Sequence, residues 1–344
     1  MYTEVFIKDF TQLGRIIGSY LNDGIKIDCI DEAVKLSCEN NPLFTRYMQV
    51  SSLKAIVSSF LDEKALRDWT SEYSEIIFEK EFEVMIVMAG NIPMVGFHDL
   101  LTVLASGRIA TVKLSGGDRY LIPAICDTLY GINSYWRERI KFREDLADSP
   151  KMVIATGGDE TAAYFRSRYS TIPSVIRGAK YSVALLKGDE NDELIEKLAI
   201  DIFLYFGMGC RSVSTLLVPE NYDLKILIEK MSAFSYITNS DHYRDAYRYQ
   251  KAISSVSGEW FLDGGFFIFK KNCSSPPPLG VVGIIEYSNE KEVEDYIATN
   301  TQSLQCTVNI KYGNLFQRFG TTQFPTLSDY ADGVNTLEFI LKNS

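Results

Sequence analysis

The chain is poor in metal-binding side chains and in long apolar runs. It has two histidines, and its six cysteines form no Cys-x-x-Cys pair, so a structural zinc site is not expected. No apolar run reaches the roughly 18 residues that a membrane span needs, and we expect no transmembrane helix. The N-terminus lacks a basic stretch followed by an apolar one, which argues against a signal peptide. Scattered cysteines are typical of reduced thiols, so we expect a cytoplasmic protein.

Positive charge is also scarce. The 35 lysines and arginines are outnumbered by 45 aspartates and glutamates, which gives a net charge of −10. Nucleic acid is therefore not expected as the main partner, because phosphate contacts require a basic face. Local groups can still hold an anionic cofactor. The length of 344 residues and the hydrophobic share of 46% indicate a soluble globular protein with two domains, or one large α/β domain with insertions.

The apolar pattern divides the chain near residue 188. Residues 1–82 show helical spacing and are expected to be mainly helical. In residues 83–188, short apolar strands alternate with helices, which predicts a doubly wound α/β domain with a parallel sheet. The strands are expected at 83–89, 110–114, 151–155 and 182–186, and the helices at 96–106, 118–135 and 159–169.

Residues 189–320 show a second pattern, which we assign to a smaller α/β catalytic domain, followed by a C-terminal segment at 321–344. A helix at 192–206 runs into a glycine-containing turn. Two strands are expected around the Gly-Gly turn within 260–269. The other expected elements are a strand at 213–218, two helical segments up to residue 253, a strand at 281–286, a helix at 291–299 and a strand at 304–310.

Cys210 closes the string Gly-Met-Gly-Cys after the predicted helix 192–206. Glycines let the backbone and a substrate approach the thiol closely, and nearby N–H groups favour the thiolate. The pattern is therefore typical of an exposed nucleophile that forms a covalent acyl intermediate, with a core thiol as the alternative. Cys126 and Cys306 fall in predicted core elements, and Cys273, in a loop, is a weaker candidate.

Three further motifs follow the ends of predicted strands. In Ala-Gly-Asn-Ile-Pro, the Asn91 amide can donate to an oxygen that gains charge, or it can simply cap the next helix. In Val-Lys-Leu-Ser, Lys113 lies at the end of a predicted strand, where a surface lysine without a ligand is common. In Thr-Gly-Gly-Asp, the N–H groups of the glycine turn can hold a phosphate, with a plain Asp159 helix cap as the alternative.

These motifs, in this order from about residue 83 to the C-terminus, resemble those of the aldehyde dehydrogenase superfamily. The chain is most similar to its fatty acyl-CoA reductase branch, whose best-known member supplies aldehyde to bacterial luciferase. The resemblance implies that Cys210 is the nucleophile, and that Asn91 and the Cys210 backbone N–H hold the oxyanion; the thiol should therefore face the Asn91 amide. It also implies that residues 83–188 form the dinucleotide-binding domain. The cofactor-binding residues that it implies are Lys113, Ser115, Thr156, Gly157 and Gly158.

Several positions depart from the family pattern. Gly116 stands where a glutamate often holds the adenosine ribose, so the resemblance favours NADP(H) and remains compatible with NAD(H). Ile176 replaces the glutamate that activates water, so a thioester should persist until a thiol or a hydride attacks it. Pro277 replaces a glutamate that holds the nicotinamide ribose. The stretch between Ile310 and Phe324 is abbreviated where the family carries its oligomerisation flap, although the superfamily implies a homo-oligomer.

The resemblance implies an acyl-CoA or acyl-protein reductase that makes an aldehyde from a thioester. One alternative is a CoA-acylating aldehyde dehydrogenase, because one site serves both directions. Another is a non-catalytic relative that hands acyl groups to an acyl-protein ligase. The closing segment 330–339 also resembles the reductase branch. We expect structural roles for His98 and for the aromatic cluster of residues 260–269.

Overall fold

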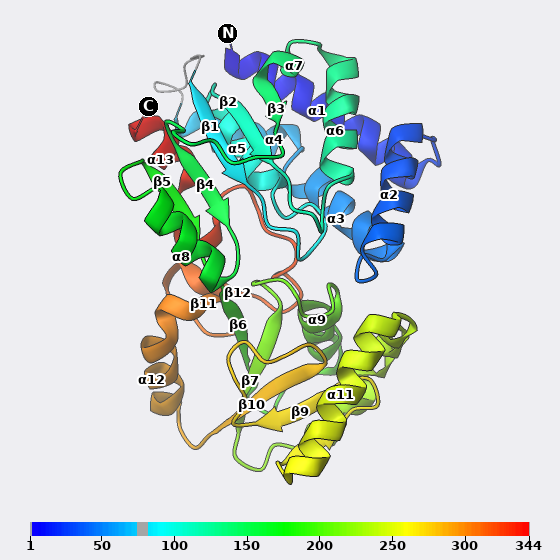
Figure 1. The fold of residues 1–344 in the computed structure, drawn as a ribbon. Helices are drawn as coiled ribbons and strands as arrows, with labels where there is room; N and C mark the ends of the chain where they lie inside the picture. Colours follow the sequence, from blue (N-terminus) through cyan, green and yellow to red (C-terminus); the bar gives the residue numbers. More distant parts are fainter. Residues whose placement is uncertain (1, 74–81, 344) are drawn as a thin grey trace. The chain divides into compact units, whose positions relative to one another are not determined.

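The computed structural model describes residues 2–73 and 82–343. The chain forms two compact units (Figure 1). Unit 1 comprises Met1–Gly178 and Pro325–Ser344, and unit 2 comprises Ala179–Phe324. Residues 74–81, the end of the predicted N-terminal helical region, lie outside the described residues.

Within the described part of unit 1, five parallel strands form one sheet in the order β3-β2-β1-β4-β5. The chain starts in the middle of the sheet, builds one edge through β2 and β3, and then returns to build the other through β4 and β5. The order therefore reverses between β1 and β4. The strands are β1 (Glu83–Val87), β2 (Ile109–Lys113), β3 (Ile140–Phe142), β4 (Val153–Thr156) and β5 (Ser174–Arg177).

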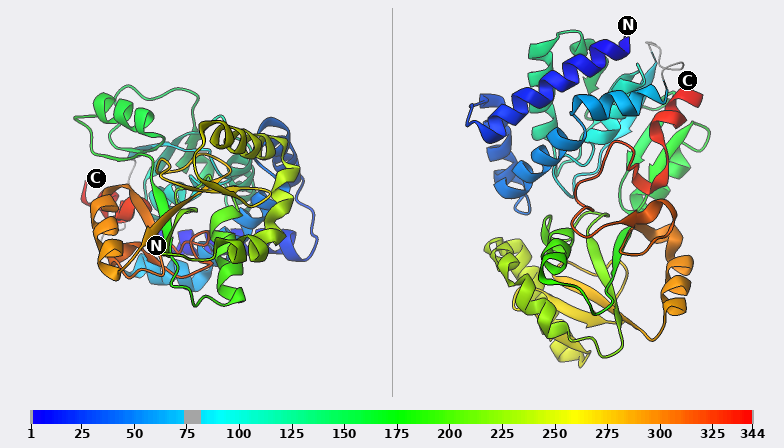
Figure 2. Two further views of the ribbon diagram at one scale, coloured as in Figure 1. Left: turned by 90° about the horizontal axis from the view of Figure 1, so that it is seen from below. Right: turned by 180° about the vertical axis from the view of Figure 1, so that it is seen from behind.

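Helices lie on both faces of this sheet, because successive side chains of each buried strand point to opposite faces. On β4, Ile154 belongs to the large core that includes α5 and α6, whereas Val153 and Ala155 pack with Phe165 of α8. Figure 2 shows the N-terminal helices and α13 together on one side. The described helices of unit 1 are α1 (Tyr2–Asn22), α2 (Asp28–Asn40), α3 (Arg46–Ser59), α4 (Glu63–Ser71), α5 (Phe97–Ala105), α6 (Leu121–Ile132), α7 (Trp136–Arg139), α8 (Asp159–Arg168) and α13 (Thr336–Lys342).

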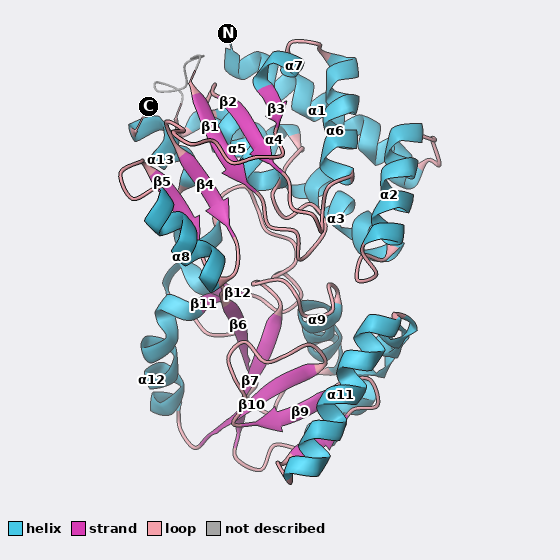
Figure 3. Ribbon diagram, in the orientation of Figure 1, coloured by secondary structure: helices cyan, strands magenta, loops and turns pink. Residues whose placement is uncertain are grey.

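Unit 2 is described throughout and contains a seven-stranded sheet in the order β12-β11-β6-β7-β10-β9-β8. All pairs are parallel except β8 and β9, which form the antiparallel pair predicted around the Gly-Gly turn (Figure 3). The strands are β6 (Tyr181–Leu185), β7 (Val213–Pro219), β8 (Phe261–Asp263), β9 (Ile268–Lys271), β10 (Val281–Tyr287), β11 (Leu304–Val308) and β12 (Phe316–Gln317).

The helices of unit 2 connect these strands. α9 joins β6 to β7, and its N-cap Asn191 accepts a hydrogen bond from the Leu194 N–H. α12 packs Val293 and Ile297 against β6 and β11. The helical segments are α9 (Asp192–Phe203), α10 (Leu224–Met231), α11 (Asp241–Ser257), α12 (Glu290–Asn300) and the short 3₁₀ segments Ser232–Asn239, Thr301–Ser303 and Gly313–Leu315.

The structure confirms an α/β fold with a doubly wound sheet, and it corrects the domain division. The units divide at Gly178–Ala179 and not near residue 188, because β6 pairs with β7 and β11 in unit 2. The helical N-terminal region and the C-terminal segment belong to unit 1 and are not separate domains. β3 and β5 were not predicted, since neither is a continuous apolar run. Within residues 2–73 and 82–343, no helix has the length and apolarity of a membrane span.

Candidate active site

Most of the predicted cofactor and oxyanion residues follow the carboxyl ends of strands in unit 1. Asn91 lies in the loop after β1, Lys113 ends β2, and Thr156 ends β4. Val87 pairs with both Lys113 and Ala155, so these strand ends are neighbours at one edge of the sheet. Ligands of doubly wound sheets bind at this edge, where the strand order reverses. The structure thus brings together Asn91, Lys113 and the glycine turn after β4.

Asn91 is exposed, and two hydrogen bonds hold the loop that carries it. The Ser52 hydroxyl donates to the Pro93 carbonyl at 2.9 Å, and the Met94 N–H donates to Asp118 Oδ2 at 2.7 Å. Met94 has a φ of 62°, a left-handed conformation that needs such support. Burial raises the pKa of Asp118 to about 7, against the opposite effect of the Met94 N–H. The loop therefore presents the amide from a fixed backbone.

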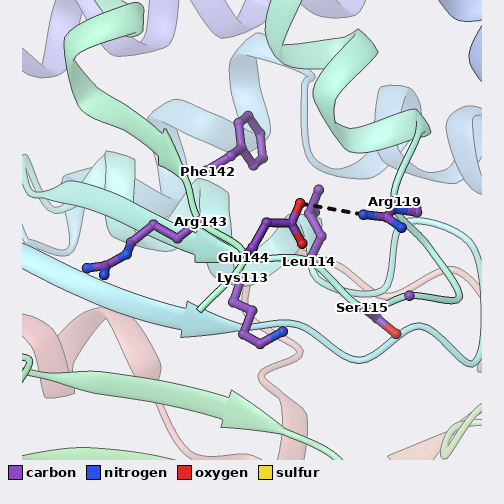
Figure 4. Close-up of a pocket in the computed structure, with 8 residues that line it drawn as sticks. Lys113, Leu114, Ser115, Arg119, Phe142, Arg143 and Glu144 are labelled. Atoms are coloured by element: carbon purple, nitrogen blue, oxygen red, sulfur yellow. Dashed lines mark ion pairs between the residues drawn. The ribbon is translucent and has the colours of Figure 1, made fainter. Parts of the chain in front are cut away.

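Lys113 lies in a pocket of about 250 Å³ together with two arginines (Figure 4). Among the described residues, the Lys113 ammonium has no hydrogen-bond or ion-pair partner. Arg119 pairs with Glu144 at 3.5 Å, and Arg143 is exposed at the pocket wall. The lining also includes Leu114, Ser115, Gly116 and Phe142. Three cations and one carboxylate give this pocket a net positive charge, which favours an anion, although the whole chain is acidic.

Gly116 and Gly158 leave open space around the same sheet edge. A Cβ at either position would meet no heavy atom within 4 Å. The space at Gly116 adjoins the pocket that contains Lys113, at the position where the family often carries a glutamate. Gly158 is the N-cap of α8, and its neighbours Thr156 and Gly157 are half-buried. The residues therefore fit an extended, phosphate-bearing cofactor, because N–H groups at a helix start favour negative charge.

The two residues that end β5 have structural contacts. The Ile176 side chain packs into the apolar cluster beneath α8. Arg177 is buried, and its Nη1 donates to both carboxylate oxygens of Asp99, at 3.0 and 2.8 Å. The same nitrogen donates to the Thr156 hydroxyl at 3.3 Å, and Nη2 donates to Thr336 at 2.8 Å. Arg177 thus supports the predicted cofactor turn from below.

Cys210 lies in unit 2, in the turn between α9 and β7. Phe206 and Gly207 both have positive φ, 56° and 77°, which bends the chain sharply after the helix. The Ser182 hydroxyl donates to the Cys210 carbonyl at 2.8 Å and accepts from the Cys306 N–H at 3.1 Å. The thiol is half-buried, on a turn with a fixed backbone. This arrangement suits a nucleophile more than a core thiol.

The other cysteines are less suited to nucleophilic chemistry. Cys126 and Cys306 are 2% and 1% exposed, which confirms them as core residues. Burial raises the pKa of Cys38, Cys126 and Cys273, so their thiolates are disfavoured. Cys29 lies within 3.8 Å of the Ala124 carbonyl at a helix contact.

His98 and the aromatic cluster have the structural roles expected of them. His98 Nε2 lies 3.0 Å from the Leu327 carbonyl, and the His98 ring packs against Phe60, Trp69 and Tyr330 in tilted and edge-on contacts. In the cluster, Phe266, Phe267 and Phe269 are at most 2% exposed, whereas Trp260 is exposed. Phe266 and Phe267 pack against Phe203 of α9, and Phe269 packs against Phe267. Within the described residues, no three His, Cys, Asp or Glu side chains are placed to hold a metal ion.

Sequence reasoning missed four residues of these sites: Asp118, Arg119, Arg143 and Arg177. Arg119 could have been found, because it is a basic residue shortly after the predicted strand 110–114, whereas Arg143 follows β3, which was not predicted. Asp118 and Arg177 carry no local signal, since their partners Met94 and Asp99 are distant in sequence.

A family model described as Acyl-CoA reductase (LuxC) matches residues 22–234, which is more than half of the chain. The chain belongs to the acyl-CoA reductase (LuxC) family. The proteins of this family are oxidoreductases that act on acyl or aldehyde groups, and the chain is one of them. No curated protein matches the chain.

Solved aldehyde dehydrogenases have the same fold as this acyl-CoA reductase family member. Aldehyde dehydrogenase 21 from Physcomitrella patens, in complex with the product succinate, is 12% identical with a TM-score of 0.65, over 98% of this chain and 84% of that chain. A mutant aldehyde dehydrogenase from Bacillus cereus is 12% identical with a TM-score of 0.63, over 90% and 72%. The NAD+ complex of a Bacillus cereus aldehyde dehydrogenase is 13% identical with a TM-score of 0.61, over 90% and 72%. At these identities the likeness shows the fold alone.

Proposed function

We propose that this protein reduces an acyl thioester to an aldehyde, with Cys210 as the nucleophile. The observation that carries the proposal is the Cys210 turn, in which a half-buried thiol follows a left-handed bend and Ser182 holds its carbonyl. Membership of the acyl-CoA reductase family supports the same chemistry. The acyl donor is an acyl-CoA or an acyl-carrier thioester.

In the first half-reaction, the Cys210 sulfur forms a bond to the thioester carbonyl carbon, and the carbon–sulfur bond to the donor breaks. The departing thiolate takes up the proton that Cys210 gives up. By the family resemblance, we assign Asn91 and the Cys210 N–H as donors to the oxygen as it gains charge, and one such donor contributes about 3–4 kcal/mol. The Ile176 side chain cannot act as a general base, so water does not compete for the acyl group.

A bound nicotinamide cofactor supplies the hydride that reduces the acyl carbonyl. We propose that Lys113, Ser115, Thr156, Gly157 and Gly158 hold it, and that it is NADP(H). The cations of Lys113, Arg119 and Arg143 in one pocket suit a phosphate at the ribose 2′ position, which carries nearly two negative charges. The single Glu144 carboxylate leaves the pocket cationic. NAD(H) lacks that phosphate and would use only part of these contacts.

The proposal includes a cytoplasmic location, a homo-oligomer, and an acyl-protein ligase as a partner that delivers acyl groups. The scattered, unpaired cysteines support the cytoplasmic location, and the superfamily resemblance supports the homo-oligomer. If the ligase carries the acyl group as a thioester, that acyl group could be transferred directly to the Cys210 thiol.

The test is a comparison of wild-type protein with Cys210→Ala. Purified protein is mixed with NADPH and acyl-CoAs of several chain lengths, and absorbance at the NADPH band is followed. We expect turnover in the wild type and none in Cys210→Ala, because the acyl-enzyme cannot form. Cys273→Ala is the matched control and should retain turnover. Undiminished turnover in Cys210→Ala would refute the nucleophile, and an acyl adduct on wild type without NADPH binding would favour a non-catalytic acyl-transfer role.

A further inference from the structure

A short segment, Gly320–Gln323, forms hydrogen bonds with the end of α9, the helix that precedes the Cys210 turn. We call these four residues the strap. The Gly320 N–H donates to Asp201 Oδ2 at 2.6 Å, and the Thr322 N–H donates to Asp201 Oδ1 at 3.0 Å. The Thr322 hydroxyl donates to the same oxygen at 2.7 Å. A single side chain of α9 therefore accepts three hydrogen bonds from the strap.

Asp201 is completely buried, with 0% of its surface exposed. A carboxylate is rarely buried unless donors compensate for the water it loses, and hydrogen bonds to charged groups are stronger than those between neutral groups. The Asp201 backbone carbonyl also accepts from Gln323 Nε2 at 3.0 Å. The end of α9 and the strap thus form one polar unit. Apolar packing alone would not fix the orientation of the strap relative to α9 so closely.

The strap in turn holds the two residues that follow Cys210. Arg211 Nε donates to the Thr322 carbonyl at 2.7 Å, and Gln323 Nε2 donates to the Ser212 hydroxyl at 3.2 Å. Both bonds span 111 residues of sequence. The contacts run from Asp201 through the strap to Arg211 and Ser212, while Ser182 holds the carbonyl of Cys210 itself.

We propose that Asp201 is a positioning residue for the Cys210 thiol and acts through the strap. This inference rests on the proposed function of Cys210. Asp201 lies in α9, nine positions before the nucleophile along the chain, and its hydrogen bonds to residues 320–323 connect it to the nucleophile turn. A loosened strap would let residues 210–212 shift, and small misplacements of a nucleophile reduce the rate of attack strongly.

The experiment measures acylation of Cys210 in a single turnover, without cofactor. Protein is mixed with varied acyl-CoA, and intact mass gives the rate at saturation and the half-saturating concentration. In Thr322→Val the hydroxyl donor is lost at nearly constant shape. We expect the saturating acylation rate to fall roughly threefold to tenfold, with the half-saturating concentration unchanged, which corresponds to the net contribution of one ordinary hydrogen bond. Thr322→Ser restores the hydroxyl and should restore most of the rate.

Two further variants complete the design. Gln323→Met removes the donor to Ser212 and should also reduce the saturating rate, even if Thr322→Val folds poorly. Asp192→Asn changes an exposed aspartate at the start of the same helix and should leave acylation unchanged. Equal acylation rates in wild type, Thr322→Val and Gln323→Met would overturn the positioning role. No acylation of the wild type would instead overturn the proposed function of Cys210.

Discussion

Asp118 shows how one buried carboxyl supports the Asn91 loop. Its Oδ2 accepts the Met94 N–H, whereas its Oδ1 is buried without a partner among the described residues. An unpartnered buried oxygen disfavours the charged form, and burial accordingly raises the pKa of Asp118 to about 7. A neutral carboxyl still accepts the Met94 N–H through its carbonyl oxygen. The loop is therefore compatible with a protonated Asp118 at moderately acidic pH.

This raised pKa predicts a pH dependence of stability. Between about pH 4 and pH 7 the folded state keeps a proton on Asp118 that the unfolded state releases, so the free energy of unfolding falls as pH rises, by about 1.4 kcal/mol per unit and at most about 4 kcal/mol in total. Above about pH 7 the contribution is constant. Asp118→Asn cannot titrate and lacks this slope. Urea unfolding of unit 1 at several pH values measures it, and parallel curves for the two proteins would contradict the assignment.

Single residues differ in how far the sequence reveals them. Cys210 and Asn91 are recognisable because glycines and a proline mark their turns. Asp118 and Asp201 look like ordinary aspartates, since their roles arise from contacts 24 and about 120 residues away. Burial and hydrogen-bond partners are properties of the folded chain, and no local pattern encodes them. The bonds that support a site are therefore harder to predict than the residues that react.

At the scale of elements, Arg177 joins three segments of unit 1. It ends β5, pairs with Asp99 in the first turn of α5, and donates to Thr336 in α13. The Arg177 and Asp99 side chains are only 4% and 11% exposed. Since the Arg177 guanidinium also touches Thr156, these segments fix the turn to which we assign the cofactor. The C-terminal helix thus contributes to the site from the end of the chain.

Loss of one partner of this ion pair should destabilise unit 1. Asp99→Asn leaves the Arg177 charge buried without its carboxylate, and we expect a loss of about 3–5 kcal/mol in the free energy of unfolding. The double variant Asp99→Leu with Arg177→Met should lose less, because no charge is left unpaired. Lys141→Gln, which breaks the exposed pair with Glu83, is the control and should change stability by less than about 1 kcal/mol. Urea unfolding measures these differences. Equal losses in the free energy of unfolding for Asp99→Asn and Lys141→Gln would contradict the role of the buried ion pair.

The elements themselves were predicted where their apolar pattern is continuous. β1, β2, β4 and β7 are buried on both faces and appear as apolar runs. β3 has two exposed residues of three, and β5 contains a serine and an arginine, so neither gives such a run. β6 was predicted as a strand but assigned to the wrong sheet, because strand pairing depends on tertiary contacts and not on local sequence.

At the scale of the molecule, unit 2 is inserted into unit 1. The chain leaves unit 1 after Gly178 and re-enters it at Pro325. Each unit has its own sheet and its own apolar core. Compact units of this size with separate cores can unfold separately. Asn91 and the residues that we propose for cofactor binding belong to unit 1, whereas the proposed nucleophile Cys210 belongs to unit 2.

We therefore expect two transitions in calorimetry, of which a cofactor fragment stabilises only one. Adenosine 2′,5′-bisphosphate at about 100 times its Kd should stabilise unit 1 by about 2.7 kcal/mol, which raises its Tm by roughly 5–10 °C. Leu304→Ala removes a fully buried side chain of unit 2 and should lower only the other transition, which identifies the two. A single transition in all variants would contradict independent units.

The same measurement separates NADP(H) from NAD(H). Adenosine 5′-monophosphate lacks the 2′-phosphate and should stabilise unit 1 less than the bisphosphate does at equal concentration. Arg143→Ala should reduce the response to the bisphosphate and leave the response to the monophosphate unchanged, since the arginine lines the Lys113 pocket and forms no ion pair among the described residues. Equal responses to the two nucleotides in the wild type would refute the 2′-phosphate site while leaving the Cys210 chemistry untouched. The proposed preference for NADP(H) thus depends on local cations and not on the net charge of −10, which would repel both cofactors.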